Sequence, residues 1–342
     1  ISMSTGIPYI KYNGAKHGKT LKKIEKFLHQ LFPEDELYNY MWEHLASVLI
    51  GMVINQTFTI YNGSGRNGKS KLVELMDQCL GEYKGTLPIT LVTSKRSVIG
   101  KATPEVADLK GLRYAVMQEP SKNEKIQEGV LKELTGGDKL QARKLYAEPV
   151  TFTPQFSLAV CTNHLFTIDT TDEGTWRRIH VVEFKSKFVD NPSPKPEDFQ
   201  FKVDRNLKEN FEKWAPVFMS KLVELAIKTK GVIKECSSVM AKSKEYRDEQ
   251  DHIGTFIDEC IVRDGSDNII NKAIVNAQYD GWYRKNFAGG GRRKEAPREI
   301  HKVIDRLFGE QIVFEGMKGW KGLAIKPDMG DTPNDLMDDD DY

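Results

Sequence analysis

The stretch Gly63-Ser64-Gly65-Arg66-Asn67-Gly68-Lys69-Ser70 decides the fold, because it fits the pattern G-x-x-x-x-G-K-[ST]. In this pattern a glycine-rich backbone turns successive N–H groups toward phosphate oxygens. The lysine reaches the β- and γ-phosphates, and the hydroxyl binds Mg²⁺. We therefore expect a nucleoside triphosphate and Mg²⁺ to bind between Gly63 and Lys71.

The residues on both sides of this loop have the patterns that it requires. The run Thr57 to Tyr61 is β-prone, and the residues after Ser70 have apolar side chains at helical spacing, namely Leu72, Val73, Leu75, Met76 and Leu80. Strand, glycine-rich loop and helix together form the expected setting. The alternative is a chance match in a glycine-containing loop, and these flanks argue against it.

Composition indicates a globular chain of two domains. The 342 residues, 39% of them hydrophobic, suffice for one large α/β domain and a smaller one. The sequence has no run of eighteen apolar residues, so we expect a soluble protein without a membrane span. Four cysteines lie far apart with no C-x-x-C pair, which favours buried thiols of an intracellular protein over a zinc site or disulfides.

Charge is unevenly distributed. The tail after Lys326 holds seven Asp and no Lys or Arg, so the chain before it has a net charge of +8, against +1 for the whole. A basic body suits a polyanionic partner, and the Asp338 to Asp341 run is typical of a solubilising tail. The chain begins at Ile1 without a signal-peptide pattern, so we expect a fragment of a longer protein.

The chain divides into five predicted parts. We expect a helical lead-in over 1–54, a nucleotide-binding core over 55–200, a helical connector over 201–250, a C-terminal domain over 251–328 and an acidic tail over 329–342. Apolar runs at 112–117, 156–161 and 179–184 are predicted strands, and helices between them imply a parallel, covered sheet. Three helices and a hairpin of 311–315 with 322–326 predict a winged-helix plan for the C-terminal domain.

Polar residues that can act in catalysis lie at the ends of three predicted strands: two strands are followed by such a residue, and one is preceded by a pair of them. Glu119 ends one strand, where it can bind Mg²⁺ through water and polarise the attacking water. Asn163 ends another at the same edge. Arg177 and Arg178 stand directly before the strand at 179–184, a suitable place for an arginine finger.

Taken together, these motifs resemble the superfamily 3 ring helicases, in the branch of the poxvirus primase-helicase and its relatives in large DNA viruses and phages. The resemblance covers roughly 27–326 and preserves the family's order of motifs. These motifs are the loop at 63–70, Leu109-Lys110-Gly111-Leu112-Arg113 leading to Glu119, Leu134-Thr135-Gly136-Gly137-Asp138, Ala142-Arg143-Lys144-Leu145-Tyr146, Thr162-Asn163 and Gly174-Thr175-Trp176-Arg177-Arg178.

The resemblance implies a role for each residue of the site. Lys69 and Ser70 bind phosphate and Mg²⁺, Glu119 activates water, and Asn163 is the first sensor. Arg178, with Arg177 as the competing candidate, is the finger that reaches a neighbouring subunit's nucleotide. Gln118 departs from the family, because many members have a second acid there, so Glu119 must serve both metal and water.

Two groups of residues are predicted to contact DNA. The segment 139–150 resembles the family's channel hairpin, in which Arg143 and Lys144 hold the nucleic-acid backbone. We expect Tyr146 to pack on this hairpin rather than to stack on a base. In the C-terminal domain a basic cluster stands where a winged helix meets duplex DNA, and the alternative is a solvated surface; its residues are Arg292, Arg293, Lys294, Arg298 and Lys302.

The resulting hypothesis is an AAA+ P-loop NTPase that hydrolyses ATP to move along single-stranded DNA as an oligomeric ring. The resemblance implies a hexamer, a role in DNA replication inside a host cell, in its cytoplasm or nucleus, and leaves open a primase domain N-terminal to Ile1. One rival is a DNA-binding initiator or regulator switched by nucleotide without unwinding. A second is a small-molecule kinase, which has no need of the paired arginines, Asn163 or the basic C-terminal domain.

Overall fold

The computed structural model describes residues 3–95, 102–118, 124–168, 172–265, 267–287, 294–314 and 316–326. The chain folds into two compact units, Ile1–Arg247 and Asp248–Tyr342. Within the described residues, no helix has both the length and the apolar character needed to cross a membrane.

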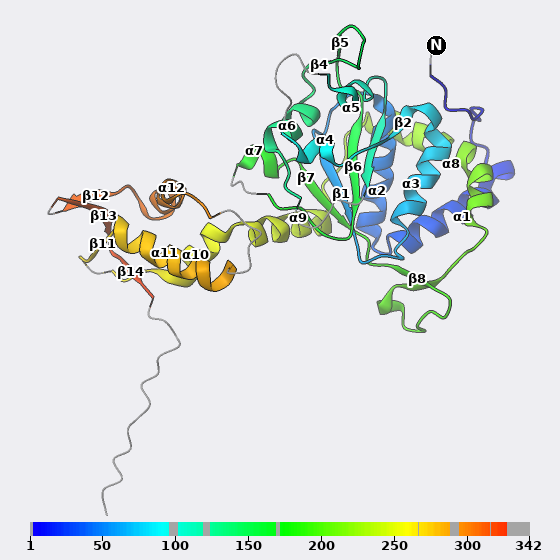
Figure 1. The fold of residues 1–342 in the computed structure, drawn as a ribbon. Coiled ribbons are helices and arrows are strands. Elements are labelled where there is room, and N and C mark those ends of the chain that lie inside the picture. The colour runs from blue at the N-terminus through cyan, green and yellow to red at the C-terminus, as the bar shows by residue number, and fades with distance from the viewer. Residues whose placement is uncertain are drawn as a thin grey trace, which may run out of the picture. The chain divides into compact units, whose positions relative to one another are not determined.

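The first unit is built on a five-stranded parallel sheet with the strand order β2-β3-β6-β1-β7 (Figure 1). The strands are β1 (Phe58–Asn62), β2 (Lys84–Leu87), β3 (Tyr114–Gln118), β6 (Ser157–Thr162) and β7 (Ile179–Glu183). β1 pairs with β6 on one side and with β7 on the other, so it lies inside the sheet. This architecture confirms the predicted mixed α/β class with a parallel central sheet.

Helices cover both faces of this sheet, as its apolar strands require. One face packs against α1 (Gly14–Leu31), α2 (Asp35–Ser47), α3 (Lys69–Leu80) and α8 (Leu207–Thr229). The other packs against α4 (Thr90–Thr93), α5 (Pro104–Ala107), α6 (Glu128–Gly136) and α7 (Glu173–Trp176). The lead-in helices and α8 therefore share one hydrophobic core with the sheet, whereas the predicted domain boundaries at 54, 200 and 250 stay predictions.

A chain of buried hydrogen bonds joins the lead-in to the sheet. His44 Nε2 on α2 lies 2.8 Å from the hydroxyl of Tyr61 on β1, which lies 2.9 Å from the hydroxyl of Tyr114 on β3. Burial lowers the pKa of His44 to about 4 and raises that of Tyr61. All three groups are therefore neutral near pH 7, and their hydrogen bonds fix α2 against the strand that leads to the glycine-rich loop.

The first unit also contains smaller elements outside the central sheet. An antiparallel hairpin, β4 (Leu140–Ala142) with β5 (Val150–Phe152), precedes β6. A two-stranded parallel ribbon, β8 (Lys187–Val189) with β9 (Gln200–Lys202), lies between β7 and α8. The helix α9 (Ser237–Gln250) contributes Tyr246, whose hydroxyl donates to the carbonyl of Phe166 at 2.7 Å.

The second unit packs three helices and short strands around its own core. The helices are α10 (His252–Cys260), α11 (Lys272–Phe287) and α12 (Pro297–Phe308). The strands are β10 (Ile261–Arg263), β11 (Ile269–Asn271), β12 (Ile312–Phe314), β13 (Met317–Lys321) and β14 (Leu323–Ile325).

The predicted hairpin of this unit is wrong in its pairing. β12 pairs with β13, while β14 pairs with β10. Gly322, at φ +72°, lies between β13 and β14, and this left-handed backbone marks the point where the chain leaves the sheet of β12 and β13. The winged-helix assignment stays a prediction. Trp282 and Trp320 are core residues of this unit, and all four cysteines of the chain are buried, as the sequence predicted.

Candidate functional site

The glycine-rich loop connects the carboxyl end of β1 to the first residue of α3. Two glycines are required by its shape. Gly68, at φ +84°, lies directly before α3, and a Cβ there would come 2.3 Å from Leu31 Cδ2. A Cβ on Gly63 would come 2.1 Å from Asn67 Nδ2 and 2.9 Å from the carbonyl oxygen of Phe184. Larger residues would push the loop off the sheet and off α1, so glycine is needed for this backbone path.

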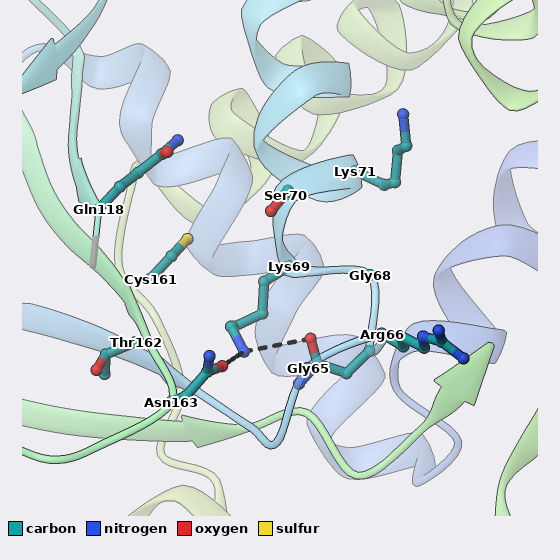
Figure 2. Close-up of a pocket in the computed structure, with 11 residues that line it drawn as sticks. Gly65, Arg66, Gly68, Lys69, Ser70, Lys71, Gln118, Cys161, Thr162 and Asn163 are labelled. Atoms are coloured by element: carbon teal, nitrogen blue, oxygen red, sulfur yellow. Dashed lines mark hydrogen bonds between the residues drawn. The ribbon is translucent and has the colours of Figure 1, made fainter.

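Lys69 is the buried cation at the centre of the site, with an exposed fraction of 7%. Its Nζ donates to the Gly63 carbonyl at 2.7 Å, to Asn67 Oδ1 at 3.2 Å and to Asn163 Oδ1 at 2.9 Å. Figure 2 shows the contacts with the loop and with Asn163, which follows β6. The structure thus brings together the lysine and the amide that the sequence predicted to meet at the carboxyl edge of the sheet.

A cavity of about 340 Å³ opens over these residues. It is lined by the glycine-rich loop, by Ser70 and Lys71 at the start of α3, and by Gln118, Cys161, Thr162 and Asn163 at the ends of β3 and β6. Figure 2 shows the Ser70 hydroxyl turned into this space, while the side chains of Arg66 and Lys71 extend away from Lys69.

The donors around the cavity fit an anion. The first backbone N–H groups of α3 have no acceptor within the helix, and the helix dipole places positive charge there. Lys69 adds a full charge, and Gly65, at φ +90°, has open space where its Cβ would be. Backbone N–H groups at a helix N-terminus, a lysine and a neighbouring hydroxyl form a donor set that fits a polyphosphate with its metal ion.

Three residues that line the cavity were not among the predicted nucleotide contacts, namely Gln118, Cys161 and Thr162. Cys161 is buried, and burial raises the pKa of its thiol to about 11, so it is a neutral wall of the site. Thr162 is buried, and its Oγ1 donates to the His164 carbonyl and accepts from the His164 N–H at 3.0 Å. In the sequence, the only signal for Cys161 and Thr162 is their position at the end of a predicted strand.

The predicted acid lies outside the described residues. Glu119 follows Gln118, which is the last residue of β3 and lines the cavity. Its predicted part in metal binding and water activation therefore stays a prediction. Among the described residues, no cluster of three His, Cys, Asp or Glu side chains could hold a metal ion.

The arginine pair lies at the amino ends of the strands, whereas the cavity lies at their carboxyl ends. Arg178 precedes β7, and its carbonyl accepts from the N–H of Phe58, the first residue of β1, at 2.6 Å. The cavity is at the other end of β1, roughly 15 Å away at the usual rise of a strand. Neither arginine can serve the cavity of its own subunit without crossing the sheet.

The two arginines have different surroundings. Arg177 is exposed, and its Nη2 donates to Gln56 Oε1 at 2.8 Å. Arg178 is mostly buried; its Nη1 donates to the Gly174 carbonyl, and within the described part of the chain its Nε is buried with no hydrogen-bond partner. Burial and the neighbouring Arg177 lower the pKa of Arg178. Arg178 thus has donor capacity that Gly174 does not use.

The β4–β5 hairpin presents its tip to solvent. Arg143 and Lys144 are exposed, and Lys144 Nζ lies 2.6 Å from Asp108 Oδ1. The expectation that Tyr146 packs on the hairpin is wrong, because its side chain is fully exposed at 105% and Leu145 beside it is 67% exposed. Tyr146 has φ +57°, so the turn points its ring outward.

The basic residues of the second unit are partly covered by acids. Lys294 forms an ion pair with Asp280, and Lys302 lies 2.8 Å from Glu299 on α12. Arg298 is exposed on the same helix. Arg292 and Arg293 lie outside the described residues, so the predicted basic cluster stays a prediction.

Comparisons with known proteins match most of the chain. A family of unknown function, DUF5906, matches residues 61–178, from the end of β1 to the arginine pair. A putative helicase of Acanthamoeba polyphaga mimivirus is 35% identical over 299 residues, which are 84% of this chain and 31% of the relative. A putative helicase of Frog virus 3 is 28% identical over 312 residues, or 89% of this chain and 31% of the relative.

Two further matches agree with these. A putative primase of African swine fever virus is 29% identical over 300 residues, which are 84% of this chain and 31% of the relative. The solved NrS-1 C-terminal region has a TM-score of 0.58 at 13% identity and covers 93% of this chain and 77% of that structure, which shows a shared fold. The chain spans about a third of the length of these viral relatives. It is thus a homologue of proteins named putative helicases and primases in large DNA viruses, as its motifs predicted.

Proposed function

We propose that this chain binds ATP with Mg²⁺ in the cavity over the glycine-rich loop and hydrolyses it to move along DNA. The observation that carries the proposal is the contact of Lys69 with Asn163 across the carboxyl edge of the sheet. It places a cation and an amide at the N-terminus of α3, where a polyphosphate fits. Two of the viral relatives are named putative helicases, which supports a helicase role, and we propose that this role is in DNA replication.

Each residue has a proposed role in hydrolysis. When the nucleotide binds, the Lys69 ammonium gives up part of its hydrogen bonding with Gly63 and Asn67 and neutralises the β- and γ-phosphates. Ser70 binds Mg²⁺ directly, and Glu119 binds it through water. The metal would neutralise charge on the phosphates. Asn163 orients the attacking water, and Glu119 polarises it. Catalysis by such a site is mostly positioning and charge stabilisation.

The arginine pair is proposed to act on a neighbouring subunit. Its place at the amino edge of the sheet excludes the cavity of the same chain, and Arg178 retains an unsatisfied buried donor. We therefore assign Arg178 as the finger and Arg177 as its neighbour anchored on Gln56. Such an arrangement requires an oligomer, which we propose is a hexameric ring of the superfamily 3 type with single-stranded DNA in its channel.

The β4–β5 hairpin is proposed to grip this DNA. Its tip combines exposed cations with an exposed aromatic ring, the pair of features that non-specific single-strand binding uses. We assign phosphate contacts to Arg143 and Lys144 and, because it is fully exposed, a base-stacking role to Tyr146. The second unit is proposed as a winged-helix module that meets duplex DNA with α12 and with the residues before it, Arg292, Arg293 and Lys294.

A strand-separation assay tests this function. Wild-type protein is expected to unwind a forked duplex in the presence of ATP. Tyr146→Ala is expected to weaken binding to single-stranded DNA about tenfold, because each base–aromatic stack contributes on the order of 1–3 kcal/mol, and to slow unwinding in proportion. ATP hydrolysis without DNA stays at the wild-type rate.

The matched control is Tyr9→Ala, which removes a 67% exposed tyrosine far along the chain from the hairpin. It is expected to bind and unwind DNA as the wild type does. If the wild-type protein binds DNA in an ATP-dependent way but separates no strands, the result would instead support the alternative hypothesis of an initiator or regulator switched by nucleotide.

A further inference from the structure

A second cavity lies against the glycine-rich loop and has a volume of about 340 Å³. It shares Arg66, Gly68 and Lys71 with the phosphate cavity. Its remaining walls come from Phe27 on α1, from the β8–β9 ribbon and from the segment that leads into α8. The two cavities thus adjoin the same residues of the loop and of the start of α3.

The lining of this second cavity is apolar with charged groups at its rim. Phe27, Phe188, Val189, Val203 and Leu207 form the apolar wall. Phe27 is held in place by the rings of Phe211 and Trp214, whose centroids lie 5.6 and 5.9 Å from its own.

At the rim, Arg205 Nη2 lies 3.1 Å from Asp190 Oδ1, and both side chains are well exposed. Asp204 lies beside them and accepts from the N–H of Asn206 at 2.9 Å. An apolar slot with carboxylates at its edge suits a flat aromatic ring that carries an amino group.

The ribbon is tied directly to the loop. The N–H of Phe188 donates to the carbonyl of Arg66 at 2.8 Å. A Cβ on Gly68 would come 3.2 Å from Phe188 Cε2, so the phenyl ring lies close against the backbone that precedes α3. The position of the ring is therefore fixed relative to the residues that hold phosphate.

We propose that this second cavity binds the base of the nucleotide and selects an aminopurine, adenine. The proposal rests on the proposed function, because it needs the phosphates in the first cavity. The base stacks on Phe188 against the apolar wall, and its exocyclic amino group donates to the carboxylates of Asp190 and Asp204. A two-ring base covers more of the wall than a pyrimidine does, and a purine with an oxo group in place of the amino group loses the donor.

The test measures the affinity of the full chain for three probes by calorimetry: a non-hydrolysable ATP analogue, the matching inosine analogue and inorganic tripolyphosphate. The inosine analogue is expected to bind wild type about tenfold more weakly than the ATP analogue. Phe188→Ala is expected to weaken the ATP analogue about tenfold and to leave tripolyphosphate unchanged. Val203→Trp, which fills the cavity from a 37% exposed position, is expected to do the same.

The matched control is Phe314→Ala, which removes a 53% exposed phenyl ring on β12 of the second unit. This variant is expected to bind all probes within about twofold of wild type, because effects of distant, independent sites do not couple. Unchanged affinity for the ATP analogue in both Phe188→Ala and Val203→Trp overturns the base assignment while the phosphate site stands. Equal binding of tripolyphosphate to wild type and Lys69→Ala overturns the phosphate site, and the base assignment falls with it.

Discussion

Replacing Lys69 by alanine is expected to lower the rate of ATP hydrolysis by about a hundredfold or more, as loss of one preorganised charge-stabilising donor does in other active sites. The side chain is 7% exposed and contacts both the loop and Asn163, so no other described cation takes its place between them. The measurement is the steady-state release of phosphate at saturating ATP and Mg²⁺, together with the melting temperature of each variant.

Lys23→Ala is the control for this substitution. Lys23 is exposed on α1, and its removal is expected to leave the rate of hydrolysis at the wild-type value. A Lys69→Ala protein that melts like the wild type and still hydrolyses ATP within tenfold of its rate would refute the phosphate-binding role of the loop.

Removing the guanidinium of Arg178 is expected to lower ATP hydrolysis by about a thousandfold, within the range measured for arginine fingers. Arg177→Ala is expected to lose less than tenfold, since its guanidinium is bound to Gln56. Because Arg178 lies at the amino ends of the strands, opposite the cavity, the loss is expected to arise at the neighbouring subunit's nucleotide.

Mixing two inactive variants separates a shared site from a local one. An equimolar mixture of Lys69→Ala and Arg178→Ala contains interfaces in which an intact loop faces an intact arginine, about a quarter of the total under random head-to-tail assembly. The mixture is expected to recover hydrolysis in that proportion. If it stays as inactive as its components while wild type is active, Arg178 acts within its own subunit or only in folding.

The core of the site was predictable because its motif carries its own geometry. The sequence predicted a strand over 57–61, and β1 is Phe58–Asn62. The meeting of Lys69 with Asn163 also follows from sequence, since carboxyl ends of neighbouring parallel strands lie at one edge. Glycine, lysine and strand ends are local signals, so few tertiary contacts were needed.

Strands whose side chains show no regular apolar pattern were not predicted from the sequence. β2 has only Leu87 buried, and β8 and β9 lie in a proline-rich, charged segment that gives no strand pattern. β8 is held by its pairing with β9 and by the N–H of Phe188, which donates to the carbonyl of Arg66 in the loop. The cavity they complete is a tertiary feature with no signature in the sequence.

The errors have a similar cause. An aromatic residue in a hairpin is most often packed, but the left-handed backbone of Tyr146 turns its ring into solvent. In the second unit the sequence paired 311–315 with 322–326, yet Met317–Lys321 is the strand that joins β11 and β12. Neighbouring apolar runs do not specify which run pairs with which.

The central claim, hydrolysis at sites shared between subunits and coupled to DNA, is tested most directly by one measurement. The rate of ATP hydrolysis per subunit is followed as the protein concentration rises, with and without single-stranded DNA. The account predicts a steep rise with concentration and a higher plateau when DNA is present. A rate per subunit that is independent of both concentration and DNA would contradict it.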